Sequence, residues 1–76
     1  MQKVESLVES IRIQVNGEDK QAPVDCSVAA LLAWLGVAGE RVAVELNRAI
    51  VRKRDWENTV VPDGAQVEIV EFVGGG

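Results

Sequence analysis

Residues 11–17 have the sequence Ile11-Arg12-Ile13-Gln14-Val15-Asn16-Gly17. Apolar and polar side chains alternate over the first five of them, as they do in a β-strand that buries one face. Asn-Gly then supplies the two residues with positive φ that a type I′ turn requires. We therefore predict a β-hairpin whose returning strand runs from about Glu18 to Val24, with Pro23 at an edge or at the strand's end.

One amphipathic helix is predicted after the hairpin. Its apolar residues recur at spacings i, i+3, i+4 and i+7: Val28, Leu31, Leu32 and Leu35. Ser27 is a suitable N-cap for this helix, and Gly36 is a suitable C-cap. Trp34 lies off the apolar stripe, so its side chain could either pack on the flank of the helix or be partly exposed.

Three further strands are predicted beyond the helix. They cover residues 42–46, 49–51 and 66–72, with turns at Asn47-Arg48 and Pro62-Asp63-Gly64 and with a loop or single helical turn at 52–58. A hairpin, one crossing helix and further strands indicate an α+β domain of the β-grasp (ubiquitin-like) type, a mixed sheet of about five strands with one main helix packed across it. We assign residues 1–10 to an N-terminal arm, 11–73 to the domain and 74–76 to a flexible glycine tail.

Composition excludes several classes of function. The chain has 76 residues, a net charge of −4, no His and one Cys. The negative charge disfavours nucleic-acid binding, and the residue types leave neither a His-based catalytic group nor a metal site. The longest apolar run is too short to span a membrane, and no secretory signal is recognisable, so we expect a cytoplasmic protein without a membrane partner.

The glycine run Gly74-Gly75-Gly76 is the most informative feature for function. Glycine has no side chain, so such a tail can thread a narrow channel into another protein's active site. The carboxylate of Gly76 is a group that can be chemically activated there. A frayed end or a cloning remnant is the alternative explanation.

The strand that leads to the tail predicts a docking surface. If Val67 and Ile69 face the helix, then Val70 and Phe72 face away from it, and an exposed apolar pair beside the tail suits a partner. Two alternatives stay open at this point. The N-terminal arm could cover the pair, or a β-bulge could turn it inward.

Two other features have both a functional and a structural explanation. Cys26 precedes the helix cap, where a thiol can become acidic, but a buried structural thiol fits better because no basic neighbour is evident. The only basic cluster is Arg48, Arg52, Lys53 and Arg54. It could pair with an acidic partner surface, although a solvated loop explains it as well.

An ordered set of short motifs resembles the ThiS family, the sulfur carriers of thiamine (thiazole) biosynthesis. The motifs are Asn16-Gly17, Ser27-Val28, Leu31-Leu32, Val42 to Leu46, Asn47-Arg48-Ala49-Ile50-Val51, Trp56, Asp63-Gly64 and Val67 to Gly76. Two features depart from the family pattern. Met1 to Ser10 is longer than the usual start, and Arg52 stands where relatives often carry Pro.

The resemblance implies a carrier protein and not an enzyme. A ThiF-like adenylating enzyme would activate the carboxylate of Gly76, and this partner would use the ATP. The carrier itself would bind no cofactor and would be a monomer when free. Sulfur from a cysteine desulfurase route would then give a thiocarboxylate, and a ThiG-like thiazole synthase would accept the sulfur. Gly74 and Gly75 would thread into the partner, and Val70 and Phe72 would dock on it.

Other functions share the glycine tail. A MoaD-type sulfur carrier for molybdopterin or another pathway has the same fold and ending. A ubiquitin-like protein modifier, joined to lysines of its targets, and a plain interaction module are alternatives of a different class. Isopeptide formation would identify the modifier, and a dispensable tail would identify the module.

Overall fold

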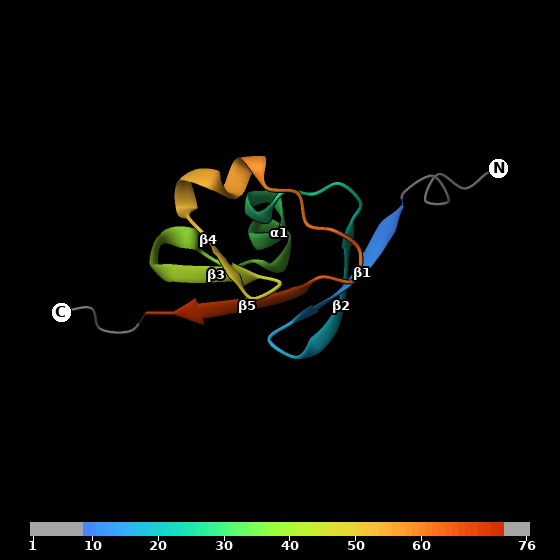
Figure 1. The fold of residues 1–76 in the computed structure, drawn as a ribbon, viewed down its shortest axis with the longest axis horizontal. Coiled ribbons are helices and arrows are strands. Elements are labelled where there is room, and N and C mark those ends of the chain that lie inside the picture. Colours follow the sequence, from blue (N-terminus) through green and yellow to red (C-terminus); the bar gives the residue numbers. More distant parts are fainter. Residues whose placement is uncertain (1–8, 73–76) are drawn as a thin grey trace.

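The computed structural model describes residues 9–72, and Figure 1 shows their arrangement. In chain order the elements are β1 (Ser10–Val15), β2 (Glu18–Pro23), α1 (Val28–Leu35), the 3-10 helix η2 (Gly39–Arg41), β3 (Val42–Leu46), β4 (Ala49–Val51), the 3-10 helix η3 (Lys53–Asn58) and β5 (Gln66–Glu71). The predicted tail, residues 74–76, and most of the predicted arm lie outside the described residues. Ser10, which we had placed in the arm, is the first residue of β1.

The five strands form one mixed sheet in the order β2-β1-β5-β3-β4. The central pair β1 and β5 is parallel, with Gln14 opposite Gln66 and Val15 opposite Val67. The other neighbouring pairs are antiparallel. The start of β1 and the end of β5 lie at opposite ends of the domain along its long axis (Figure 1). The predicted fold class, a mixed sheet with one main helix, is confirmed.

Both hairpins have the turn that their sequence predicts. Asn16 and Gly17 have φ values of 51° and 85°, and Asn47 and Arg48 have 51° and 73°, so both central residues of each turn are left-handed. The returning strand of the first hairpin ends at Pro23, one residue earlier than expected. Proline suits that position because it has no N–H to donate to the ladder.

Helix α1 has the bounds and the caps that the sequence predicts. The Ser27 side chain accepts a hydrogen bond from Ala30 N at 3.0 Å, and Gly36 ends the helix at φ 76°. Gly36 N donates to the Ala33 carbonyl and Val37 N to the Leu32 carbonyl, which is the Schellman arrangement. Among the described residues, no helix has the length and apolar character needed to cross a membrane.

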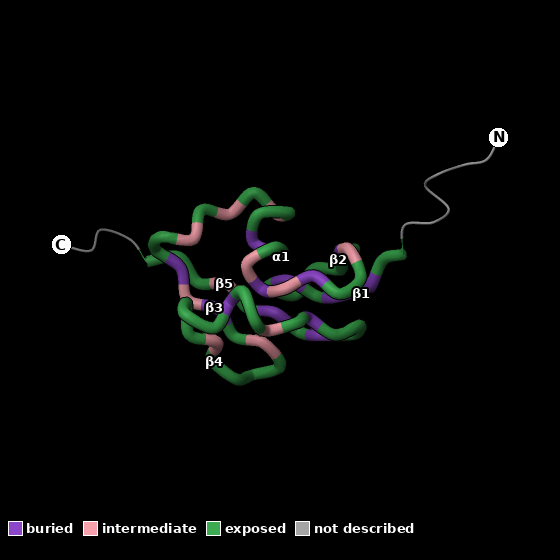
Figure 2. The backbone as a smooth tube through the Cα atoms, turned by 90° about the horizontal axis from the view of Figure 1, so that it is seen from above, coloured by how far each residue is buried: buried purple, intermediate pink, exposed green. Residues whose placement is uncertain are grey.

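The core lies between α1 and one face of the sheet. Its buried residues are Ile11, Ile13, Val15, Ala22, Cys26, Val28, Leu31, Leu32, Val42, Val44, Trp56, Val61, Ala65 and Val67. Figure 2 shows buried and exposed residues alternating along β1, as expected for a strand with one buried face.

Trp56 closes one end of this core. Its ring is buried, and its Nε1 donates to the Val51 carbonyl at 2.9 Å. The segment that carries it is a 3-10 helix, Lys53–Asn58. Gly39 packs against the ring so closely that a Cβ built there would lie 3.0 Å from Trp56 Cζ3. Gly39 therefore leaves room for the indole.

Candidate functional site

The described residues contain no group of three or more His, Cys, Asp or Glu residues that could hold a metal ion. Cys26 is buried, as we expected, and desolvation by burial raises the pKa of its thiol. A thiol with a raised pKa is a poor nucleophile at neutral pH because little of it is ionised.

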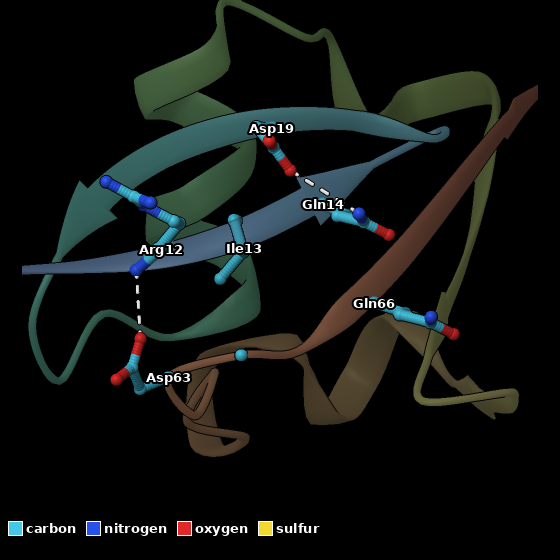
Figure 3. Close-up of a pocket in the computed structure, with 7 residues that line it drawn as sticks. Arg12, Ile13, Gln14, Asp19, Asp63 and Gln66 are labelled. Carbon is cyan, nitrogen blue, oxygen red and sulfur yellow. Dashed lines mark hydrogen bonds between the residues drawn. The ribbon is translucent and has the colours of Figure 1, made fainter.

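A hollow of about 370 Å³ lies beside β1 and the start of β5, and Figure 3 shows how its polar side chains are arranged. Asp63 Oδ1 accepts a hydrogen bond from Arg12 N at 2.9 Å, and Gly64 N donates to the Arg12 carbonyl at 2.8 Å. The 62–64 turn thus satisfies the backbone of β1 before its pairing with β5 begins. These polar contacts serve the fold, and the hollow opens beside Gln66, at the start of β5 rather than near its end.

Strand β5 is held along its whole length, which matters because it leads to the glycine tail. At its start, Asn47 N donates to the Gln66 carbonyl at 2.7 Å and Asn47 Oδ1 accepts from Gln66 N at 2.9 Å. Further along, the side chain of Asn16 exchanges two hydrogen bonds with the backbone of Ile69, at 2.8 and 3.2 Å.

The far end of β5 is held by β3. The antiparallel register is continuous from the pair Leu46–Val67 to the pair Val42–Glu71, so no bulge intervenes. Phe72 lies one residue past the strand and still donates its N–H to the Arg41 carbonyl at 2.7 Å. Backbone hydrogen bonds therefore fix the path of the chain as far as Phe72. The predicted sulfur-carrying Gly76 and the threading residues Gly74 and Gly75 lie outside the described residues.

The predicted facing of β5 is confirmed. Val67 is buried and Ile69 half-buried toward the helix, whereas Val70 and Phe72 are each 56% exposed. We call the face of the sheet that is turned away from α1 the outer face. The outer face therefore carries an apolar pair directly before the tail.

Sequence reasoning missed a third member of this surface. Ile50 of β4 is 72% exposed and is paired with Glu45, whose side chain also lies on the outer face. Ala43 lies between the two strands, opposite Val70. We call this surface the apolar strip; it consists of Ala43, Ile50, Val70 and Phe72. β4 has only three residues, so the sequence held no alternation long enough to show that Ile50 faces outward.

The alternative in which the N-terminal arm covers Val70 and Phe72 rests on residues 1–8, which lie outside the described residues.

Comparisons with known proteins agree with this geometry. The model of the ThiS family matches residues 13–76. A solved structure, the thiamine biosynthesis protein (ThiS) from Geobacter metallireducens, has a TM-score of 0.77 and 36% sequence identity, over 87% of this chain and 100% of that chain. The sulfur carrier protein ThiS of Bacillus subtilis is 35% identical over 65 residues, 84% of this chain and 98% of its own length.

A second kind of relative is much longer. The thiazole synthase of Paramagnetospirillum magneticum is 42% identical over 66 residues, which are 87% of this chain and 20% of that protein. The thiazole synthase of Magnetococcus marinus matches over the same fraction, with 39% identity. The chain thus spans about a fifth of the length of these relatives.

Proposed function

Since this chain belongs to the ThiS family, we propose that it is a sulfur carrier of thiamine biosynthesis whose Gly76 carboxylate becomes a thiocarboxylate. The observation that carries the proposal is that the family match runs through residue 76 and so includes Gly74-Gly75-Gly76. The coverage of the Bacillus subtilis carrier, 98% of its length, supports the same function.

The proposed chemistry begins with activation of the carboxylate. A carboxylate oxygen of Gly76 attacks the α-phosphorus of ATP, pyrophosphate leaves, and an acyl adenylate forms. The terminal sulfur of a cysteine persulfide on a partner protein then attacks the acyl carbon, and AMP leaves with the bonding electron pair. A second thiol attacks the cysteine sulfur of this adduct and releases the thiocarboxylate, with a disulfide as the other product.

This division of labour matches the chain's own chemistry. Cys26 is buried and the described residues hold no metal-binding cluster, so the carrier contributes the reacting carboxylate and its placement. A ThiF-like adenylating enzyme supplies the ATP site, and a cysteine desulfurase route supplies the persulfide. In this proposal the carrier itself binds no cofactor, the adenylating partner uses the ATP, and the reaction takes place in the cytoplasm.

The sulfur acceptor in this proposal is a ThiG-like thiazole synthase. Two proteins named thiazole synthase contain a stretch about 40% identical to this chain, which supports a close relation between carrier and synthase. Val70 and Phe72 provide the docking contact, because exposed apolar side chains next to the tail can anchor a partner while the glycines enter its active site.

The test is intact-mass measurement of the purified chain after incubation with a ThiF-like enzyme, ATP and a persulfide donor. Replacement of oxygen by sulfur adds about 16 Da, and we expect that gain only when ATP is present. Fragmentation should place the added mass on Gly76. An unchanged mass with an active enzyme, or an isopeptide bond to another protein's lysine, would contradict the proposal.

A further inference from the structure

Three exposed residues lie in or beside β4: Arg48, Ile50 and Arg52. Val51 is half-buried and pairs with the buried Val44, whereas Ile50 pairs with Glu45 on the outer face. Arg52 keeps an extended backbone, with φ −68° and ψ 148°, so the alternation continues through it. Ile50 is therefore an exposed apolar residue with an arginine two positions away on either side.

These two arginines lie in the most basic part of an acidic chain. The whole chain has eight Lys plus Arg against twelve Asp plus Glu. Four of the eight basic residues lie between 48 and 54: Arg48, Arg52, Lys53 and Arg54. The one salt bridge seen within residues 9–72 joins Lys20 to Glu18, so neither Arg48 nor Arg52 has a described carboxylate partner.

Ile50 makes the β4 segment part of the apolar strip. Ile50 is paired with Glu45, and the register puts Arg52 one step beyond the Val44–Val51 pair, next to Ala43. Ala43 in turn lies opposite Val70 of β5. A partner that covers Val70 near the tail therefore meets Ala43 and Arg52 when its contact extends by two strands. It meets Ile50 and then Arg48 when the contact also extends toward the start of β5.

We propose that Arg48, Ile50 and Arg52 extend the docking face to the β4 edge, and that they bind a protein partner which offers an apolar contact rimmed by Asp and Glu side chains. This inference rests on the proposed function, since that partner is the adenylating enzyme. Ile50 fills the apolar contact, and the two guanidinium groups pair with the rim. The chain's net charge of −4 disfavours a phosphate backbone, and the exposed Ile50 calls for an apolar contact that a protein surface offers, so a protein partner with an acidic rim suits these residues better.

Charges at the rim of an interface act mainly on the rate of association and on its salt dependence. Reversing one arginine should therefore slow association about tenfold at low ionic strength. The difference from wild type should shrink as salt is raised, because the Debye length falls from about 30 Å at 0.01 M to about 8 Å at 0.15 M. Loss of the Ile50 side chain acts through apolar contact and should not depend on salt in this way.

The test compares Arg52→Glu and Ile50→Ala with matched controls. Lys20→Glu makes the same change of charge, but Lys20 borders the groove beside Leu35 and Gly36, on the helix side of the sheet. Val60→Ala removes the same kind of exposed apolar contact at a residue bridged to Ser27, away from β4. Association and dissociation rates with the ThiF-like enzyme are measured from 0.02 to 0.5 M salt, beside ATP-dependent loading and thermal melts.

We expect slower, less salt-sensitive association for Arg52→Glu, faster dissociation for Ile50→Ala, and wild-type behaviour for both controls. Wild-type rates in Arg52→Glu and Ile50→Ala, with normal loading of the wild type, would overturn this inference and leave the proposed function standing. Failure of the wild type to load would instead count against the proposed function. A dimer that forms through Ile50, detected by sedimentation and abolished by Ile50→Ala, would also overturn the inference.

Discussion

The side chain of Asn16 pairs with the backbone of Ile69 as another strand would. Ile69 N donates to Asn16 Oδ1 at 2.8 Å, and Asn16 Nδ2 donates to the Ile69 carbonyl at 3.2 Å. β1 has already ended at Val15, so this amide extends the parallel pairing of β1 and β5 by one step. A turn residue near the start of the chain thus holds the strand that leads to the glycine tail.

Asn16→Gly should destabilise the domain by removing the two hydrogen bonds between the Asn16 side chain and Ile69. Glycine keeps the positive φ of the turn at little cost and removes only the side chain. Two partly solvated hydrogen bonds contribute about 1–2 kcal/mol together, so we expect Tm to fall by about 4–16 °C. Hydrogen exchange at the Ile69 amide should become faster than at Val44, in the middle of β3. Unchanged protection of the Ile69 amide would contradict this role for Asn16.

Local signals carried most of the fold prediction. Asn16-Gly17, the Ser27 cap and the Gly36 cap each determine the backbone within a few residues, so the first hairpin and α1 follow from neighbouring positions. The clamp between Asn16 and Ile69 joins residues 53 positions apart. Nothing local in the sequence distinguishes an asparagine that only forms a turn from one that also binds a distant strand.

The site was predictable only in part for a similar reason. Six residues of alternation in β5 gave the correct facing of Val70. β4 has three residues, and a segment this short has no pattern of its own to show which side faces the helix. The exposure of Ile50 follows from the pairing of β4 with β3, which puts Ile50 opposite Glu45 and Val51 opposite the buried Val44.

Substitution of Gly39 should destabilise the core at Trp56. In Gly39→Ala the new Cβ would lie 3.0 Å from Trp56 Cζ3, so the ring or the backbone must move. Such overpacking costs about 1–3 kcal/mol, and the near-ultraviolet circular dichroism of the indole should change with it. Gly36→Ala is the control, because its Cβ meets nothing within 4 Å and only the φ of 76° is strained. It should lower Tm without altering the Trp56 signal.

Opposite faces of β5 should respond differently to the same charge. Val67→Asp places a carboxylate in the core, where Val67 is 2% exposed, and should unfold the domain. Val70→Asp places it on the outer face and should leave Tm within a few degrees of wild type, while binding to the ThiF-like enzyme weakens about tenfold or more. Circular dichroism and a binding titration measure the two effects. Unfolding of Val70→Asp would show that Val70 belongs to the core.

Alkaline pH should weaken the fold through Cys26. Burial raises the pKa of the Cys26 thiol in the folded state, so the folded protein holds its proton to higher pH than the unfolded chain does. The resulting stabilisation is fully present below the thiol's unfolded pKa and is lost as pH rises through the folded value. Melts between pH 7 and 10.5 should show a smaller loss of Tm for Cys26→Ala than for the wild type. Parallel curves for the two proteins would argue against a buried thiol.

Changes at the chain terminus should abolish sulfur loading and leave the domain folded. Deleting Gly76, or adding one glycine after it, shifts the reacting carboxylate by about 3.3–3.6 Å when the chain is extended. A misplacement of about 1 Å can already cost a reaction ~10²-fold in rate. Gly75→Val should also impair loading, because a β-branched side chain does not fit a channel made for glycine. Sulfur loading is measured by intact mass, and thermal melts check that each variant is folded. If the extended protein loads at the wild-type rate without proteolytic trimming, the terminal carboxylate is not the reactive group.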